Sequence, residues 1–197
     1  MKISPQHLVK IKKDKRLKLP TCSSGWFPFD EISVIVEGEK GMSIIETLNQ
    51  MNFTRVYTLG RLSRSSETEW DTQPRGYNNT IRWNAGHIFV TMEYFTSLVI
   101  DEYEIVNSKW IPFFVTGTMP SSWEGDAPSR EDILEALGEQ AVRITKAFEG
   151  KLEESIAEPI KIGPHTMETV GAVVQFILWH EGVHAGIIEG LNRTTTQ

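Results

Sequence analysis

The chain has 197 residues, of which 40% are hydrophobic and 23% charged, and its formal net charge is −6 at pH 7. These values are typical of a single globular domain, exclude a chain that is disordered throughout, and disfavour a general nucleic-acid-binding protein, which usually carries a basic face. The single cysteine, Cys22, excludes an internal disulfide, and no apolar run approaches the ~18 residues of a membrane helix, so we expect a cytoplasmic protein without a nucleic-acid or membrane partner.

Residues 1–41 differ in character from the rest of the chain. The first twenty carry seven basic side chains and one acidic one, a turn-rich stretch follows over 21–28, and a short strand is predicted over 31–36. Runs of charge are commonly solvated, so we interpret this part as an extension; a basic arm that binds an acidic partner is the alternative.

The five residues before Met42 support a further interpretation of this extension. Their codons are purine-rich, as those of a translated ribosome-binding site would be, so translation could start at Met42 and residues 1–41 would then not belong to the native core. We divide the chain into an N-terminal extension, 1–41, and one domain, 42–197.

The first half of that domain predicts two helices. Residues 43–62 place apolar side chains at three- and four-residue spacing, and 63–77 are rich in loop-forming residues. The second helix is predicted over 80–99 with Asn79 as its cap, and its apolar face consists of Ile81, Ile88, Met92, Phe95 and Val99. Residues 100–128, with three prolines and two glycines, predict a long connection that includes a short helix around 102–110.

The second half predicts two more helices. Ser129 caps the third, which runs to about Lys151 with an apolar side of Ile133, Leu137, Val142, Ile144 and Phe148. After a break over 159–164, the last helix runs from Thr166 to about Leu191. The sum is an all-α fold, a four-helix bundle with a long connection between helices two and three and no sheet beyond the strand near the start.

Two histidines of the last helix share its apolar stripe, which steps by three or four residues through Val170, Val173, Ile177, His180, His184, Ile188 and Leu191. Residues four apart lie ~5–6 Å from one another on one helix face, so both imidazoles can reach one metal ion. His87, in the middle of the second helix, is expected to face inward as well. Three imidazoles leave a position open for water or substrate, as in catalytic zinc sites; hydrogen-bonded core histidines are the alternative.

The segment His180–His184 also spells H-E-x-x-H, the zinc-protease motif. A protease of that type needs a third ligand, usually downstream. No histidine follows His184, and Glu189 is the sole downstream carboxylate. A metalloprotease is therefore disfavoured.

Two segments resemble motifs of a known family. Residues 79–88, Asn-Thr-Ile-Arg-Trp-Asn-Ala-Gly-His-Ile, resemble the second-helix motif of the DinB/YfiT-like superfamily, and 179–186, Trp-His-Glu-Gly-Val-His-Ala-Gly, resemble its last-helix motif. The resemblance covers about 42–193 and implies a bundle that is commonly dimeric. It implies a divalent metal ion, zinc or nickel with iron or manganese as alternatives, bound by His87, His180 and His184.

Members of this family with known activity include thiol S-transferases that use bacillithiol and mycothiol-dependent isomerases, and others are described as metal-dependent hydrolases. The resemblance therefore implies a metal-dependent enzyme that transfers a low-molecular-weight thiol to a small-molecule substrate. A metal-dependent hydrolase and a non-catalytic metal-binding stress-response protein are the alternatives. The fold predicts the metal far better than the substrate.

Several neighbours of the histidines are weaker candidates. Glu181 is a candidate base or ligand partner, but the residue after a ligand points about 100° away on a helix, so a carboxylate between helices is the alternative. Asn84 is a candidate hydrogen-bond partner of a ligand or substrate. We interpret Trp83, Tyr94 and Trp179 as packing residues. The long connection offers four aromatic residues for surface packing, a lid or a dimer contact: Trp110, Phe113, Phe114 and Trp123.

Overall fold

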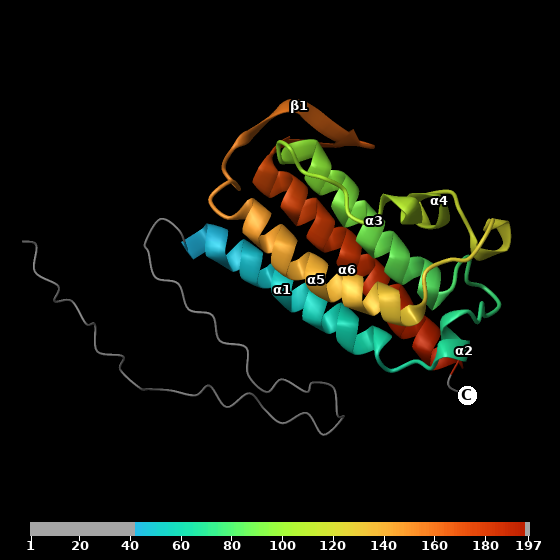
Figure 1. Cartoon of the computed structure of the whole chain (residues 1–197). Helices are drawn as coiled ribbons and strands as arrows, with labels where there is room; N and C mark the ends of the chain where they lie inside the picture. The colour runs from blue at the N-terminus through green and yellow to red at the C-terminus, as the bar shows by residue number, and fades with distance from the viewer. Residues whose placement is uncertain (1–41, 196–197) are drawn as a thin grey trace, which may run out of the picture. The chain divides into compact units, whose positions relative to one another are not determined.

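The structure is a computed structural model that describes residues 42–195 (Figure 1). The predicted strand at 31–36, the basic stretch and the turn-rich stretch lie outside the described residues, and the division at residue 42 stays a prediction. Most of the described chain is helical, as predicted. The α-helices are α1 (Met42–Leu62), α2 (Glu67–Trp70), α3 (Ile81–Val99), α4 (Ile111–Phe114), α5 (Arg130–Phe148) and α6 (Val170–Thr195). The remaining elements are two 3-10 turns, Ser108–Trp110 and Pro120–Ser122, and two strands, β1 (Ser155–Ile162) and β2 (His165–Thr169).

The four long helices run side by side (Figure 1). Both α1 and α3 pack against α5 and α6. The apolar core between them forms two clusters. One lies towards α2 and includes Trp70, Phe89 and Phe114, and the other lies towards the hairpin and includes Phe148 and Met167.

Helix α3 is covered on more than one side. Its cap is Thr80 rather than the predicted Asn79, because the Thr80 side chain accepts a hydrogen bond from the Trp83 N–H. Every residue from Ile81 to Val90 is buried, since α4 packs on α3 in addition to α5 and α6. The buried charge of Arg82 is paired with Asp71 and Glu67. This covering places the middle of α3 inside the protein.

The prediction of an all-α fold is wrong for residues 155–169, which form an antiparallel hairpin. Its pairing is irregular between Ser155 and Ile160, where Pro159 has no N–H to donate to the partner strand. Gly163 supplies the positive φ of the turn, at +56°. The sequence predicts a break over 159–164, whereas Pro159 lies in β1 and Pro164 lies in the turn that follows it. Helix α6 consequently begins at Val170 and not at Thr166.

The hairpin also ties the start of α6 to the chain that leaves α5. The N–H of Val170 donates to the carbonyl of Glu154 at 3.0 Å, and the N–H of Gly171 donates to that of Leu152 at 2.8 Å. A Cβ on residue 171 would lie 2.7 Å from the Leu152 oxygen, so only glycine permits this approach. Two backbone carbonyls therefore satisfy the first N–H groups of α6.

Three smaller predictions are also corrected. The predicted loop over 63–77 contains α2, which Ser66 and Glu69 cap reciprocally. The short helix expected at 102–110 begins only at Ser108 and continues as α4. Val142, predicted on the apolar side of the third helix, is 74% exposed, since Ile144 and Leu137 already define the buried side of α5.

Candidate metal centre

Three histidine side chains meet where α3 packs against α6. His87 comes from the middle of α3, and His180 and His184 lie one turn apart on α6. Each offers one ring nitrogen, and these three atoms lie within 4.8 Å of one another. The ring centroids are 4.6 to 4.9 Å apart. The structure thus brings together the three histidines that the sequence singled out.

Hydrogen bonds set the tautomers of two of these rings. The Nδ1 of His87 lies 2.7 Å from the carbonyl oxygen of Phe114, which can only accept, so Nδ1 carries the proton. The Nδ1 of His184 lies 2.8 Å from Oδ1 of Asn84. Asn84 is oriented by its own amide N–H, which donates to the Thr80 carbonyl at 2.7 Å. Both histidines are therefore left with a lone pair on Nε2.

The spacing of two of these nitrogens fits a divalent ion. The Nε2 atoms of His87 and His180 are 3.1 Å apart. A tetrahedral zinc ion, with Zn–N distances of 2.0–2.1 Å, holds its nitrogen ligands roughly 3.3 Å apart. The same separation also fits a hydrogen bond from His180 Nε2–H to His87 Nε2. In that case the histidines would be hydrogen-bonded core residues without a metal ion.

The electrostatics of the cluster favour neutral rings. Burial lowers the pKa of His87 below its ordinary value, although the bond to the Phe114 carbonyl partly opposes this. Burial, with a smaller effect of the neighbouring rings, lowers the pKa of His180 to about 4 and that of His184 to about 3. A metal ion requires neutral imidazoles, so these shifts keep the lone pairs available near pH 7.

Aromatic rings flank the cluster. Trp83 stacks on His87 with centroids 4.5 Å apart and an interplanar angle of 15°, and its Nε1–H donates to Thr118 Oγ1 at 2.9 Å. It therefore packs against a candidate ligand. Tyr94 and Trp179 are 52% and 63% exposed, and each contacts one neighbouring ring, Phe95 and Phe176 respectively, so they pack at the surface and not in the core. Of the four aromatic residues of the connection, Trp110 and Phe114 belong to the core and Phe113 and Trp123 pack against it, which goes beyond the surface packing that was one of the predictions.

Glu181 follows His180 on α6, but its side chain points to the neighbouring, inner side of the helix, towards α1. It is 1% exposed, and both of its oxygens accept hydrogen bonds from Arg55 of α1, at 2.9 and 3.0 Å. The alternative of a carboxylate between helices therefore describes it, and the structure does not bring it to the histidines. Sequence reasoning placed His180 and His184 on the core stripe, but both are half-buried, and Glu181 is the residue that points inward at this level.

Arg55 is the centre of a buried polar network that sequence reasoning missed. Its guanidinium also donates to the Leu137 carbonyl at 2.5 Å and to Gln140 Oε1 at 3.0 Å. Gln140 in turn donates to Glu93 Oε1 at 2.7 Å. The position of Arg55 could have revealed that it is buried. It lies four residues after buried Met51 and seven before buried Leu62, on the apolar side of α1.

A further pair of charges closes this network at the long connection. Arg143 of α5 donates to Glu93 at 2.6 Å, and Tyr103 of the connection donates to the other Glu93 oxygen at 2.9 Å. Burial raises the pKa of the Tyr103 hydroxyl, which keeps it protonated as a donor. All four long helices thus contribute to one hydrogen-bonded network.

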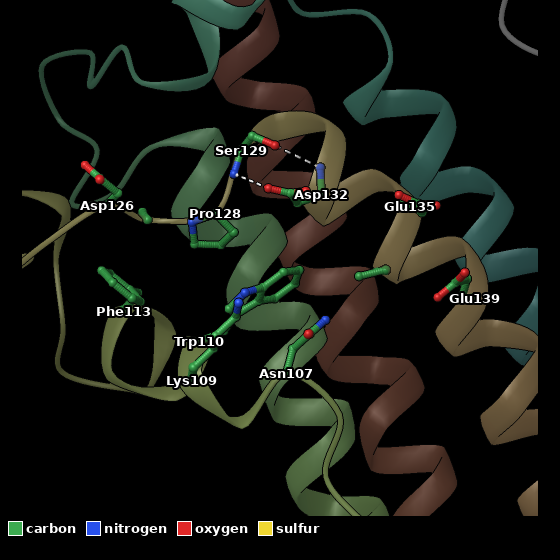
Figure 2. Close-up of a pocket in the computed structure, with 12 residues that line it drawn as sticks. Asn107, Lys109, Trp110, Phe113, Asp126, Pro128, Ser129, Asp132, Glu135 and Glu139 are labelled. Atoms are coloured by element: carbon green, nitrogen blue, oxygen red, sulfur yellow. Dashed lines mark hydrogen bonds between the residues drawn. The ribbon is translucent and has the colours of Figure 1, made fainter.

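A cleft of about 640 Å³ lies elsewhere, between the long connection and the first half of α5 (Figure 2). Figure 2 shows the ring of Trp110 in its floor and the capping bonds between Ser129 and Asp132 at its edge. Four carboxylates line it: Asp126, Asp132, Glu135 and Glu139. None of the three histidines lines this cleft, so it is separate from the candidate metal centre.

Comparison with known proteins gives one finding about the family. A model described as the DinB superfamily matches residues 50–188, well over half of the chain. The matched range contains all three histidines and Asn84. No curated protein matches the chain. No helix within residues 42–195 combines the length and apolar character that crossing a membrane requires.

Proposed function

Because the chain belongs to the DinB superfamily, we propose that it binds a divalent metal ion through Nε2 of His87, His180 and His184. The observation that carries this proposal is the convergence of three ring nitrogens from two helices. The acceptors on Nδ1 of His87 and His184 support it, because such partners fix the tautomer that a metal ligand needs. Zinc or nickel is proposed, with iron or manganese next. The mutual packing of α1, α3, α5 and α6 supports a four-helix bundle of the DinB type.

We propose further that the protein is an enzyme, a transferase that joins a low-molecular-weight thiol to a small electrophilic substrate. A divalent ion with an open position lowers the pKa of a thiol or water that it holds, and so supplies a nucleophile near neutral pH. The protein's own contribution is to hold three neutral imidazoles in place and to shield them on the inner side. The half-buried positions of His180 and His184 support access from solvent.

The exposed surface of α3 and α6 supports a homodimer. The only charged residues of α3 are Arg82 and Glu93, and the only one of α6 before Glu189 is Glu181. All three are buried and held in ion pairs with residues of other segments. Four large hydrophobic side chains are exposed on the same two helices: Tyr94, Leu98, Trp179 and Val183. An uncharged exposed surface of this kind is typical of a protein interface, and a second copy is the occupant that we propose.

Light scattering tests the dimer. We expect Trp179→Arg to shift the protein to monomer. Val142→Arg, at a 74% exposed site on α5, should leave the dimer intact. A wild-type monomer at working concentration would refute this part of the proposal.

Elemental analysis of protein purified without a metal-affinity tag tests the metal centre. We expect about one metal ion per chain, as a single three-histidine site holds, and its loss in His87→Ala. A protein that contains no metal and takes up no added zinc, nickel or manganese would refute the proposal. With metal confirmed, consumption of thiol in the presence of an electrophile supports the transferase, turnover of an ester without thiol supports the hydrolase, and bound metal without turnover supports the stress-response alternative.

A further inference from the structure

Gly86 precedes His87 on α3 and lies directly under the ring of Phe114. A Cβ on residue 86 would lie 2.5 Å from three carbon atoms of that ring, closer than real Cβ atoms approach. Phe114 is fully buried, and its ring packs edge-on against Trp123 with centroids 5.5 Å apart. The aromatic ring therefore occupies the space that a side chain at residue 86 would need.

Phe114 contacts the neighbouring residue of α3 through its backbone. Its carbonyl oxygen accepts the hydrogen bond from His87 Nδ1 at 2.7 Å. This carbonyl is available because it belongs to the last residue of α4, while the Ile111 carbonyl already accepts the N–H of Val115 at 3.0 Å. Since ring and carbonyl belong to one residue, the contact of the ring with Gly86 limits how closely the carbonyl approaches α3.

The rest of the connection holds Phe114 in this place. The Nε1–H of Trp123 and the hydroxyl of Thr118 both donate to the Phe113 carbonyl at 2.7 Å. Thr118 also accepts the Nε1–H of Trp83, the residue that stacks on His87. The connection is thus braced against itself and against α3, and the ring of Phe114 sets how closely it approaches.

We propose that Gly86 and Phe114 are a positioning pair for the metal centre. The missing side chain at residue 86 lets α4 sit close enough for the Phe114 carbonyl to hold Nδ1–H of His87, which leaves Nε2 as the ligand atom. This inference rests on the proposed function only where zinc affinity is measured. The tautomer of His87 can be measured in the protein without metal.

A methyl group at residue 86 would break this arrangement in a defined way. Because the ring of Phe114 already packs against Trp123, we expect the methyl group to push α4 off α3 and to draw its carbonyl away from Nδ1 of His87. The ring of His87 is then free to carry its proton on Nε2, which removes the lone pair that a metal needs. Loss of such an outer partner typically weakens metal binding by about 10- to 100-fold.

The test compares Gly86→Ala with Gly138→Ala. Gly138 is also inside a long helix, but a Cβ there would meet nothing within 4 Å. Two quantities are measured on variants that circular dichroism shows to be folded: zinc affinity by competition with a chromophoric chelator, and the ¹⁵N chemical shifts of His87 in metal-free protein. We expect Gly86→Ala to bind zinc about 10- to 100-fold more weakly and to lose the Nδ1-protonated tautomer, and Gly138→Ala to match wild type.

Phe114→Val and the double variant Gly86→Ala/Phe114→Val complete the cycle. Valine lacks the ring atoms that a methyl at residue 86 would strike, so the methyl partly refills the space that the ring leaves. We expect Phe114→Val alone to weaken zinc binding, and the double variant to bind more tightly than the product of the single effects predicts. If Gly86→Ala does not fold, Phe114→Val and the double variant decide the matter.

The opposite results would overturn the inference. A folded Gly86→Ala variant with wild-type zinc affinity and tautomer would show that Gly86 only permits packing, as would a Phe114→Val variant indistinguishable from wild type in both readouts. If wild-type protein binds no metal, the proposed function fails, yet the ¹⁵N shifts of His87 still confirm or refute the positioning role.

Discussion

Helix α6 places consecutive residues in opposite surroundings. His180 belongs to a half-buried, uncharged region whose hydrogen-bond partners are a carbonyl, an amide and another imidazole. Glu181 belongs to a sealed region in which Arg55 is 2% exposed and the two charges pair through two hydrogen bonds. The first region leaves ring nitrogens available for a ligand, whereas the second uses its donors and acceptors internally. One face of the helix can therefore bind a ligand, while the neighbouring inner face fixes the rotation of the helix.

The largest expected effect is a loss of folding stability when the buried ion pair of Glu181 and Arg55 is broken. Glu181→Gln leaves the buried Arg55 guanidinium without its counter-charge, and breaking a buried ion pair in this way typically costs about 3–5 kcal/mol. We expect urea unfolding to show a loss of this size, while the folded variant keeps its metal. Arg55→Met/Glu181→Met should lose less than Glu181→Gln, since no unpaired charge remains.

If Glu181→Gln lost metal without losing stability, the carboxylate would act on the histidines and the two regions would not be independent.

A smaller effect is expected on the histidine side. Asn84→Leu removes the acceptor of His184 Nδ1 but leaves the ligand itself, so we expect zinc affinity to fall by about 10- to 100-fold. Gln175→Ala, at an exposed position of α6, is the matched control and should not change affinity. Equal affinities of Asn84→Leu and wild type would show that His184 does not need this partner.

The smallest expected effect concerns pH. The folded-state pKa is about 4 for His180 and about 3 for His184, below the ~6.5 of an exposed histidine. The unfolded chain therefore binds more protons between these values, so the metal-free protein loses stability as pH falls from about 6.5 towards 4. Each histidine contributes at most about 1.4 kcal/mol per pH unit. In urea unfolding at pH 6 and pH 5, His184→Gln should show a shallower fall than wild type; equal falls would refute the contribution.

The two regions also differ in how far sequence could predict them. The spacing of His180 and His184 is local to one helix, so their meeting was predictable. His87 was a candidate from its place in the second helix, and the resemblance joined it to the other two. The acceptor on His87 was not predictable, because a backbone carbonyl of the connection supplies it and carbonyls leave no mark in the sequence. Arg55 was overlooked because a charge on an apolar stripe is interpretable only when its partner on another helix is known.

The fold shows the same limit. Helical periodicity predicted the four long helices to within a few residues at most ends, because each buries one side against its neighbours. The hairpin was missed because Pro159 lies at an irregular point of the pairing, where proline costs no ladder bond. Val142 was wrongly assigned to the buried side of α5, because periodicity gives the direction of the buried side of a helix but not how wide that side is.

The backbone hydrogen bond from Gly171 to Leu152 fixes the position of the first turn of α6. His180 lies ten residues after Val170, which corresponds to ~15 Å along the axis at 1.5 Å per residue. Insertion of one residue between them would advance both histidines by ~1.5 Å and turn them by about 100°, away from His87 and towards other helices. The length of α6 before His180 is thus as much a determinant of the site as the histidines, and this segment should tolerate substitution far better than insertion or deletion.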